Sequence, residues 1–465
     1  MVIHRYLGVA MGVPMLLWCL SGAVMLFVHY PSLSQDERLA QSPRIDWSNC
    51  CRMADAAPPD ARIDSAAIEQ LAASPVLRLR IEGGDRRMVD LATGAPLGQV
   101  SPTQAAAVAT GWGRVGDITP VASDQWTVSG EFNRVRPFWR VRLVDGARTD
   151  LYVSQVTGEV AQRTTARSRA LNWLGAVPHW LYPSLLRRNT ALWTQVVIWT
   201  SLAGLFLTVA GLYLGVLAWG RSRDGRVSPF RGLMTWHHLS GLTAGLLTLA
   251  WVASGLFSMN PLGFLESPGD NARQRIAGTP ATFSQVQAAL EAVAAAAPAA
   301  AQARIAPLDG RIFVMSGNAR YDALGRRVPM TPADLTLAGR RLGPVAGQAL
   351  LASEDSYYFS HHERVTLPVW RVLLRDGRRL YLDPQSGALL ADVDAPARGY
   401  RWLHQGLHRL DFVPGYRQGA LWAAIVLILL SAASLGVGTG VWLAWRRLVL
   451  DVASLRGQRA GRARP

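Results

Sequence analysis

Four long runs without a charged residue stand out along this chain. They cover residues 6–28, 191–220, 239–265 and 419–445. Each run exceeds the roughly 20 residues that an α-helix needs to cross a lipid bilayer. The pattern therefore predicts four transmembrane helices, which leave two long polar segments and one short loop between them.

Within the two polar segments the apolar positions follow shorter periods. Residues 76–91 alternate apolar and polar side chains around Gly83 and Gly84, which predicts a β-hairpin. Strands are expected at 137–143 and 151–153, with the turn pair Asp145-Gly146 between them. The alanine-rich stretches 103–110 and 286–303 predict helices. Each polar segment is therefore expected to form a small α+β domain.

The two halves of the chain repeat each other. His4, Gly8, Gly12 and Trp18 return without a gap as His237, Gly241, Gly245 and Trp251. The strand pattern and the segment before each returning helix also recur. The sequence thus predicts a tandem duplication in which each half has a membrane helix, an α+β domain and a returning helix. Such parallel repeats are related by a pseudo-two-fold axis along the membrane normal.

Charge gives the expected orientation. The chain carries a net charge of +16 and has no lysine, and arginines crowd residues 221–235 and the tail 446–465. The positive-inside rule places both of these in the cytoplasm of a bacterial inner-membrane protein, with the termini inside. No basic patch interleaves with aromatic residues, which argues against a nucleic-acid partner. The predicted order is a helix at 1–29, a periplasmic domain at 30–190, a helix at 191–220, a loop at 221–235, a helix at 236–265, a periplasmic domain at 266–418, a helix at 419–445 and the tail.

Two pairs of histidines fall at opposite ends of these helices. His4 and His237 lie at the predicted cytoplasmic face, each on a stripe with two glycines of the Gly-x-x-x-Gly type, which is typical of close helix packing. His179 and His408 precede the returning helices at the other face. Two neutral imidazoles that face each other are the usual axial ligands of a low-spin haem iron. We therefore expect a haem at each face, with interfacial anchoring as the alternative for these histidines.

The remaining histidines break the symmetry between the repeats. His404 is a substitute ligand or a neighbour of one, and His29 has the right predicted depth to join the site at the same face. His238 is expected to meet lipid headgroups. Zinc is a weaker alternative, because no cysteine or carboxylate clusters with the histidines at a usual spacing. His361, His362 and Glu363 form a further candidate metal group, for which a solvated loop is favoured.

Cysteine and tryptophan add little to this picture. Cys50 and Cys51 are adjacent, so a vicinal disulfide or pairing with a partner protein is an alternative, but two incidental cysteines are favoured. Trp18 and Trp251 are expected near the middle of the membrane. Packing is favoured for these indoles over a part in electron transfer.

The chain resembles the PepSY-associated transmembrane family. The resemblance rests on the openings at His4 and His237, the Ser-Gly pair near each helix end, His179 and His408, and the repeated Pro-x-Trp-Arg-Val strands. It implies four membrane helices, periplasmic PepSY-like domains and, in the reductase members, b-type haems. Two haems are expected here. For this chain it implies His4 and His237 inside and His179 and His408 outside, with His29, His238 and His404 as further candidates.

The resemblance also implies an activity. It suggests an oxidoreductase that passes electrons outward to a ferric siderophore or a similar iron chelate. Electrons would come from quinol or from a cytoplasmic donor, since the sequence contains no nucleotide-binding glycine loop. The alternative is a non-enzymatic PepSY membrane protein that binds peptide or regulates a neighbouring transporter.

Overall fold

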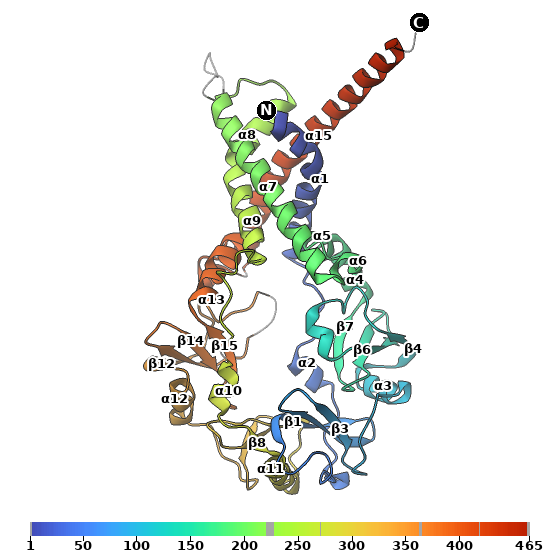
Figure 1. The fold of residues 1–465 in the computed structure, drawn as a ribbon, viewed down its shortest axis with the longest axis vertical. Coiled ribbons are helices and arrows are strands. Elements are labelled where there is room, and N and C mark those ends of the chain that lie inside the picture. Colours follow the sequence, from blue (N-terminus) through green and yellow to red (C-terminus); the bar gives the residue numbers. More distant parts are fainter. Residues whose placement is uncertain (1, 220–226, 270, 362–364, 418, 463–465) are drawn as a thin grey trace. The chain divides into compact units, whose positions relative to one another are not determined.

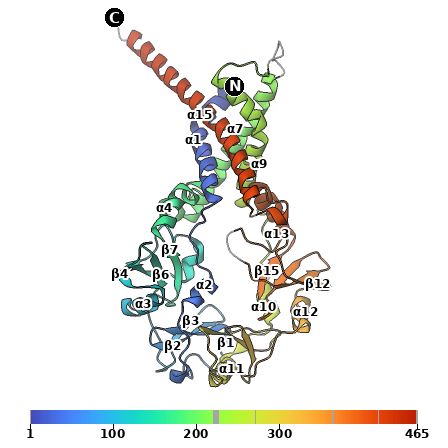
Figure 2. The ribbon, with the colours of Figure 1, turned by 180° about the vertical axis from the view of Figure 1, so that it is seen from behind.

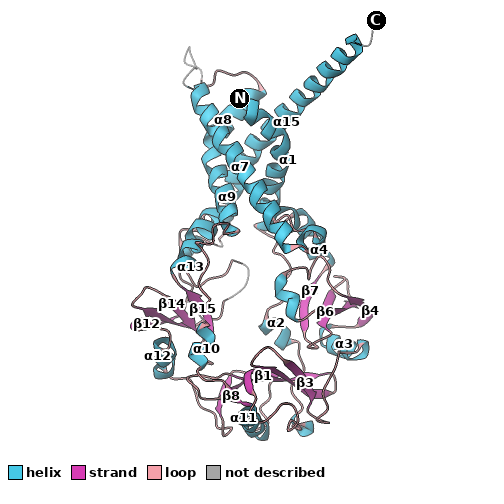
Figure 3. Ribbon diagram, viewed as in Figure 1, coloured by secondary structure: helices cyan, strands magenta, loops and turns pink. Residues whose placement is uncertain are grey.

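The structure is a computed structural model that describes residues 2–219, 227–269, 271–361, 365–417 and 419–462. It divides into two compact units, which are treated separately below. The helical unit contains residues 1–30, 170–266 and 396–465, and the sheet unit contains residues 31–169 and 267–395. Figure 1 follows the chain from α1 to α15, and Figure 3 shows that the strands all belong to the sheet unit.

Three helices of the helical unit are long and apolar enough to cross a membrane: α1 (Val2–Met25), α7 (Thr190–Trp219) and the first part of α15 (Ala420–Arg462). A fourth span forms only if α8 (Leu233–Thr243) and α9 (Gly245–Ser258) are counted together, and this pair bends by 59°. The described part of the chain therefore holds three such helices, or four with the bent pair.

The prediction of one continuous helix over residues 236–265 was wrong. The helix breaks at Ala244, where the hydroxyls of Ser240 and Thr243 on one side and of Thr248 on the other donate to carbonyls four residues back. Such side-chain bonds compete with the helical ladder and bend helices. The second half ends at Ser258 because a proline at position 261 disfavours helical geometry at the residue before it.

Two glycines of the predicted stripes mark close contacts between helices. A side chain at Gly12 of α1 would lie 2.9 Å from Val441 of α15, and one at Gly245 of α9 would lie 2.6 Å from Leu212 of α7. Each glycine thus lets the opening helix of one repeat approach the returning helix of the other. The close packing of α1 and α15 is visible from both sides (Figures 1 and 2).

Shorter helices complete the helical unit between the long ones. A π-helical turn, η4 (Arg401–Gly406), precedes α14 and carries His404. The other short elements are α4 (Ala166–Leu174), α5 (Ala176–His179), α6 (Ser184–Arg187), α13 (Ala395–Tyr400), α14 (Leu407–Arg409) and η5 (Pro414–Tyr416).

The sheet unit contains three antiparallel sheets. The first segment forms a four-stranded sheet in the order β4 (Val115–Val121), β5 (Phe138–Leu143), β6 (Asp150–Ser154), β7 (Val160–Thr164). The second segment forms its counterpart from β12 (Val345–Leu351), β13 (Val369–Leu374), β14 (Arg379–Leu382) and β15 (Leu389–Val393). The strands expected at 137–143 and 151–153 are confirmed as β5 and β6.

The third sheet is built from both polar segments. The predicted hairpin is confirmed as β2 (Ser74–Ile81) and β3 (Arg86–Asp90), and the path continues through β1 (Arg62–Leu71). On its other side β1 pairs with β9 (Gln302–Ile305) from the second segment. The remaining strands are β10 (Phe313–Ser316), β11 (Ala319–Asp322) and β8 (Ala281–Thr282), which also pairs with β1. The two segments, which the sequence presents as one domain each, therefore share a sheet.

Helix α11 (Phe283–Ala295) covers one face of this joint sheet. Its buried side chains recur at helical spacing from Phe283 to Val293 and pack on Ile68 and Leu77. The helix stops eight residues before the end of the predicted stretch, because Pro298 follows closely and the chain then enters β9. The other helices of the unit are α2 (Gln35–Ala40), α3 (Pro102–Ala109), α10 (Ala272–Ala277) and α12 (Pro332–Arg340), with the 3-10 turns η1 (Trp47–Asn49), η2 (Thr110–Trp112) and η3 (Gly130–Arg134).

A disulfide joins Cys50 and Cys51 at the edge of the core beneath α11. The interpretation of these residues as incidental cysteines was therefore wrong, and the vicinal disulfide that the sequence offered as an alternative is present. Trp18 packs against Met11, Met15 and Leu207, as expected of a packing residue.

Candidate functional site

The structure brings His4 of α1 and His237 of α8 together inside the helical unit. Their ring centres lie 6.4 Å apart and their planes are tilted by 37°. The Nδ1 atom of His4 donates to the carbonyl of Leu207 at 3.2 Å, and that of His237 donates to the carbonyl of Gly436 at 3.0 Å. A carbonyl can only accept, so each ring carries its proton on Nδ1 and leaves the lone pair of Nε2 free to bind a metal.

Each ring of this pair lies against a glycine of the returning helix in the same repeat. A side chain at Gly211 would come within 2.8 Å of Cε1 of His4, and one at Gly440 would come within 2.8 Å of Cε1 of His237. No other residue type fits there without a shift of the ring. The two glycines thus hold the imidazoles in matching orientations. They lie on helices that carry neither histidine, so no spacing in the sequence links them to the rings.

The second pair, His179 and His408, is built in the same way. The ring centres are 5.9 Å apart, with an interplanar angle of 68°. Nδ1 of His179 lies 3.1 Å from the carbonyl of Trp18 and 3.1 Å from the hydroxyl of Ser21, and Nδ1 of His408 lies 3.0 Å from the hydroxyl of Ser254. Ser21 and Ser254 are equivalent in the two repeats and belong to the Ser-Gly pairs that the sequence marks without a role.

Burial favours the neutral form of these two imidazoles. It lowers the pKa of His179 to about 4 and lowers the pKa of His408 well below its ordinary value. The nearby cation Arg409 acts in the same direction on both rings. A neutral imidazole is the form that binds a metal ion. A side chain at Gly22 would lie 3.3 Å from Cε1 of His179, and one at Gly255 would lie 3.8 Å from Cε1 of His408, so these rings also lie against glycines.

The other candidate histidines differ among themselves. His404 is four residues before His408, with ring centres 5.4 Å apart, and its Nδ1 lies 2.9 Å from the carbonyl of Ser254. It has no histidine counterpart in the first repeat. In His238 both nitrogens are engaged, with the hydroxyl of Ser228 and the carbonyl of Gly215 at 2.9 Å each. This ring has no free nitrogen for a metal. It is buried within the protein, whereas the sequence predicted a position at the lipid headgroups.

Two further expectations concern His29 and residues 361–363. His29 is exposed, and its backbone carbonyl accepts a hydrogen bond from Asn172 at 2.9 Å. Of the candidate metal group at residues 361–363, only His361 belongs to the described part of the chain, so His362 and Glu363 lie outside it.

A metal ion bound between two imidazoles sets the distance between their rings. A metal ion about 2.0 Å from each Nε2 would hold the ring centres about 6 Å apart. The pairs His4–His237 and His179–His408, at 6.4 Å and 5.9 Å, match this separation. Across residues 2–462, the described ranges contain no group of three or more His, Cys, Asp or Glu side chains that could hold a metal. Two-histidine sites fit haem, whose ring supplies the other ligands, better than zinc.

A buried ionic cluster lies next to the His179–His408 pair in the second repeat. Asp411 is almost fully buried between Arg401, at 3.0 Å, and Arg417, at 3.4 Å. The equivalent positions of the first repeat hold Asn172 and Tyr182 in place of Arg401 and Asp411. The cluster is thus specific to the half that carries His404, and nothing in the local sequence pattern marked it.

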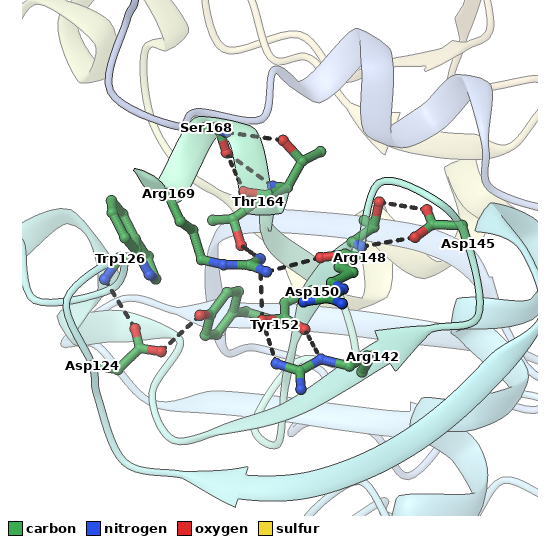
Figure 4. Close-up of polar contacts among 12 residues, drawn as sticks. Asp124, Trp126, Arg142, Asp145, Arg148, Asp150, Tyr152, Thr164, Ser168 and Arg169 are labelled. Carbon is green, nitrogen blue, oxygen red and sulfur yellow. Dashed lines mark hydrogen bonds and ion pairs between the residues drawn. The ribbon is translucent and has the colours of Figure 1, made fainter. Parts of the chain in front are cut away.

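A paired tyrosine and aspartate recur in the two four-stranded sheets. The hydroxyl of Tyr152 donates to Asp124 at 2.7 Å, and that of Tyr381 donates to Asp355 at 2.9 Å. Figure 4 shows the first pair, in which Asp124 also accepts from the backbone of Trp126. Both aspartates close a turn and fasten it to a buried strand, so the pairs stabilise the fold. Their repetition supports the internal duplication.

A family model described as the PepSY-associated TM region matches residues 1–351. The chain belongs to this family. The match covers the first repeat and the opening helices and joint-sheet strands of the second, and together with the long apolar helices it identifies a PepSY-associated membrane protein. The search of curated proteins found no match to the chain, and the search of solved structures found none either.

Proposed function

We propose that this PepSY-associated protein is a haem-binding oxidoreductase of the bacterial inner membrane that passes electrons outward to a ferric siderophore or a similar iron chelate. The observation that supports it best is the repeated histidine arrangement. In both pairs a hydrogen bond holds Nδ1, the Nε2 atom remains available, and the separation suits a single metal ion. If these histidines only anchored the helices at a membrane surface, a ring of one repeat would have no reason to face the equivalent ring of the other.

The residues assigned to the two haems are His4 with His237, and His179 with His408. A bound b-type haem supplies a one-electron carrier whose potential depends on its axial ligands and its surroundings. The carbonyls of Leu207 and Gly436 fix the tautomer and orientation of the first two rings, and the carbonyl of Trp18 does so for His179. The hydroxyl of Ser254 donates to the carbonyl of Trp251 and can therefore accept from Nδ1 of His408. Such hydrogen bonds make Nε2 a better donor to a metal.

Orientation and partners belong to the same proposal. Arginine in the 221–235 loop and in the tail supports cytoplasmic termini, with the sheet unit in the periplasm. Electrons would enter from quinol or from a cytoplasmic donor at the His4–His237 side. They would leave at the His179–His408 side, where one electron converts Fe(III) in the chelate to Fe(II) and weakens its binding.

The first experiment is a visible spectrum of the detergent-purified protein, oxidised and then reduced with dithionite, with a pyridine haemochrome assay. We expect about two b-type haems per chain and a sharp reduced α-band. Protein that is colourless after expression in haem-replete cells would refute the proposal and favour the non-enzymatic alternative, a membrane protein that binds peptide or regulates a transporter.

Substitutions assign the ligands. His408→Ala should remove one of the two haems and abolish the reduction of ferric chelates, and His4→Ala should remove the other. The matched controls are His238→Gln, whose nitrogens are both engaged, and His29→Gln, which is exposed; both should keep two haems. Loss of haem in His404→Gln with retention in His408→Ala would reassign the second pair.

A further inference from the structure

One face of the joint sheet is covered and the other is open at its centre. Ala66 and Ile68 of β1 are buried beneath α11. Ser65 and Ala67, which alternate with them, point to the opposite face, where Ser65 is exposed and Ala67 only half-buried. Figures 1 and 2 both show α11 on one side of β1. A central strand of a seven-stranded sheet thus presents a serine and a small alanine to an accessible surface.

Arginines border this surface on both sides. Ala67 pairs with Arg78 on β2 and with Arg304 on β9, so the two guanidinium groups flank it in one row across three strands. Arg80 pairs with Ser65 in the next row. Because strands lie about 4.8 Å apart and rise about 3.4 Å per residue, these side chains frame a platform of roughly 10 by 7 Å. We call Ser65, Ala67, Arg80 and Arg304 the arginine platform.

The charges around the platform are not equally compensated. Glu69 forms ion pairs with Arg78 at 2.8 Å and with Arg38 at 2.7 Å. Arg80 reaches Asp64 through a single nitrogen at 3.4 Å, and 39% of its side chain is exposed. Among the described residues, none forms a hydrogen bond or an ion pair with the guanidinium of Arg304.

The pKa of Arg304 agrees with this description. Burial lowers it, and Asp383 offsets the effect only in part. A close carboxylate can instead raise the pKa of a guanidinium, as Glu69 does for Arg38. Arginine stays charged in proteins, so Arg304 holds a partly desolvated positive charge that no carboxylate in the described ranges pairs with.

We propose that the arginine platform binds a small anionic ferric chelate with carboxylate or catecholate oxygens at its periphery. Arg304 on one side and Arg80 on the other donate to these oxygens, and Ser65 and Ala67 leave room for the chelate between them. Guanidinium groups form short, charge-assisted and often paired hydrogen bonds with such oxygens. The size of the platform suits a mononuclear complex. The choice of iron as the bound metal rests on the function proposed above, whereas the preference for an anion rests on the platform alone.

The test uses gallium(III) in place of iron(III), because gallium has the same charge and is not reduced. The full-length protein in detergent is titrated with an anionic tris-catecholate complex and with a neutral tris-hydroxamate complex by calorimetry. We expect the anion to bind clearly more tightly than the neutral complex. Arg304→Gln should weaken anion binding by roughly ten- to a hundredfold, the range for the loss of a charge-assisted hydrogen bond, and Arg80→Gln should weaken it by a smaller factor.

The control is Arg340→Gln, an exposed arginine on α12 that lies off the platform and should leave binding unchanged. Equal affinity of the wild type and Arg304→Gln, equal binding of the two complexes, or binding of an acidic peptide but of neither chelate would overturn the inference. If the protein reduces a ferric chelate but binds the chelate equally well without Arg80 and Arg304, the proposed function stands and the platform is refuted as the binding site. A protein that lacks haem but still binds the anion through Arg304 would retain the platform and refute the proposed function.

Discussion

The buried carboxylate of Glu69 is expected to hold the two polar segments together. It lies on β1, accepts two hydrogen bonds from Arg38 of α2 at 2.7 Å and 2.9 Å, and contacts Arg78 of β2 at 2.8 Å. Gln302 of β9, from the other segment, also donates to it. Glu69→Gln keeps the shape of the side chain but leaves two nearly buried arginines without their anion, which is the costly way to break an ion pair.

The size of the effect follows from the pKa. Burial alone would raise the pKa of Glu69, but Arg78 and Arg38 outweigh it and lower the pKa from 4.5 to about 2. A difference of this size corresponds to about 3 kcal/mol of stability at neutral pH. Because the folded state has the lower pKa, this contribution is complete above about pH 4.5 and disappears as the pH falls toward 2.

Hydrogen–deuterium exchange of the peptides that contain β1 and β9 measures this effect in the full-length protein. At neutral pH, Glu69→Gln should speed their exchange about a hundredfold, the factor that corresponds to about 3 kcal/mol. The matched control is Glu159→Gln, which lies 3.5 Å from Arg38, is more exposed and should change exchange by less than about fivefold. Equal effects of the two variants, or a wild-type advantage that persists at pH 2, would refute the reasoning.

Two further predictions concern packing contacts. Tyr152→Phe removes the hydrogen bond to Asp124, which keeps its backbone donors, so exchange in β6 should rise by the equivalent of about 1 kcal/mol and no more. Gly440→Ala should displace the ring of His237, which a Cβ would approach to 2.8 Å, and lower the haem content on the pyridine haemochrome assay; Gly8→Ala, where nothing lies within 4 Å, is the control and should retain both haems.

Local periodicity predicted the strands and the hairpin that depend on neighbouring residues alone. The strands around 137–143 and 151–153 and the hairpin after residue 76 depend on alternation and turn residues, and the structure has them. The break at Ala244 depends on side-chain hydroxyls that bond the backbone, and hydropathy alone does not register it. Helix α11 ends before Pro298 although the alanines continue, so the proline and not the alanine content determines its end.

Contacts between distant segments could not be predicted in this way. The pairing of β1 with β9 joins residues that lie more than two hundred positions apart, and each strand alone has only the alternation common to all strands. The proximity of His4 to His237 was inferable because the two histidines occupy the same position in a repeated sequence motif. The carbonyls and the glycines Gly211 and Gly440 that orient the rings lie on other helices and become recognisable only in the fold.

The repeated sequence motifs also explain why the candidate sites need both halves. His4 and His179 come from the first repeat, and their partners His237 and His408 come from the second. Each opening helix packs on the returning helix of the other repeat, at Gly12 against α15 and at Gly245 against α7. A single repeat would therefore bury neither glycine face and would supply only one imidazole per site. A two-fold arrangement of identical chains could form such pairs, but only the fused chain allows one site to gain features such as His404 and Asp411 without imposing them on its counterpart.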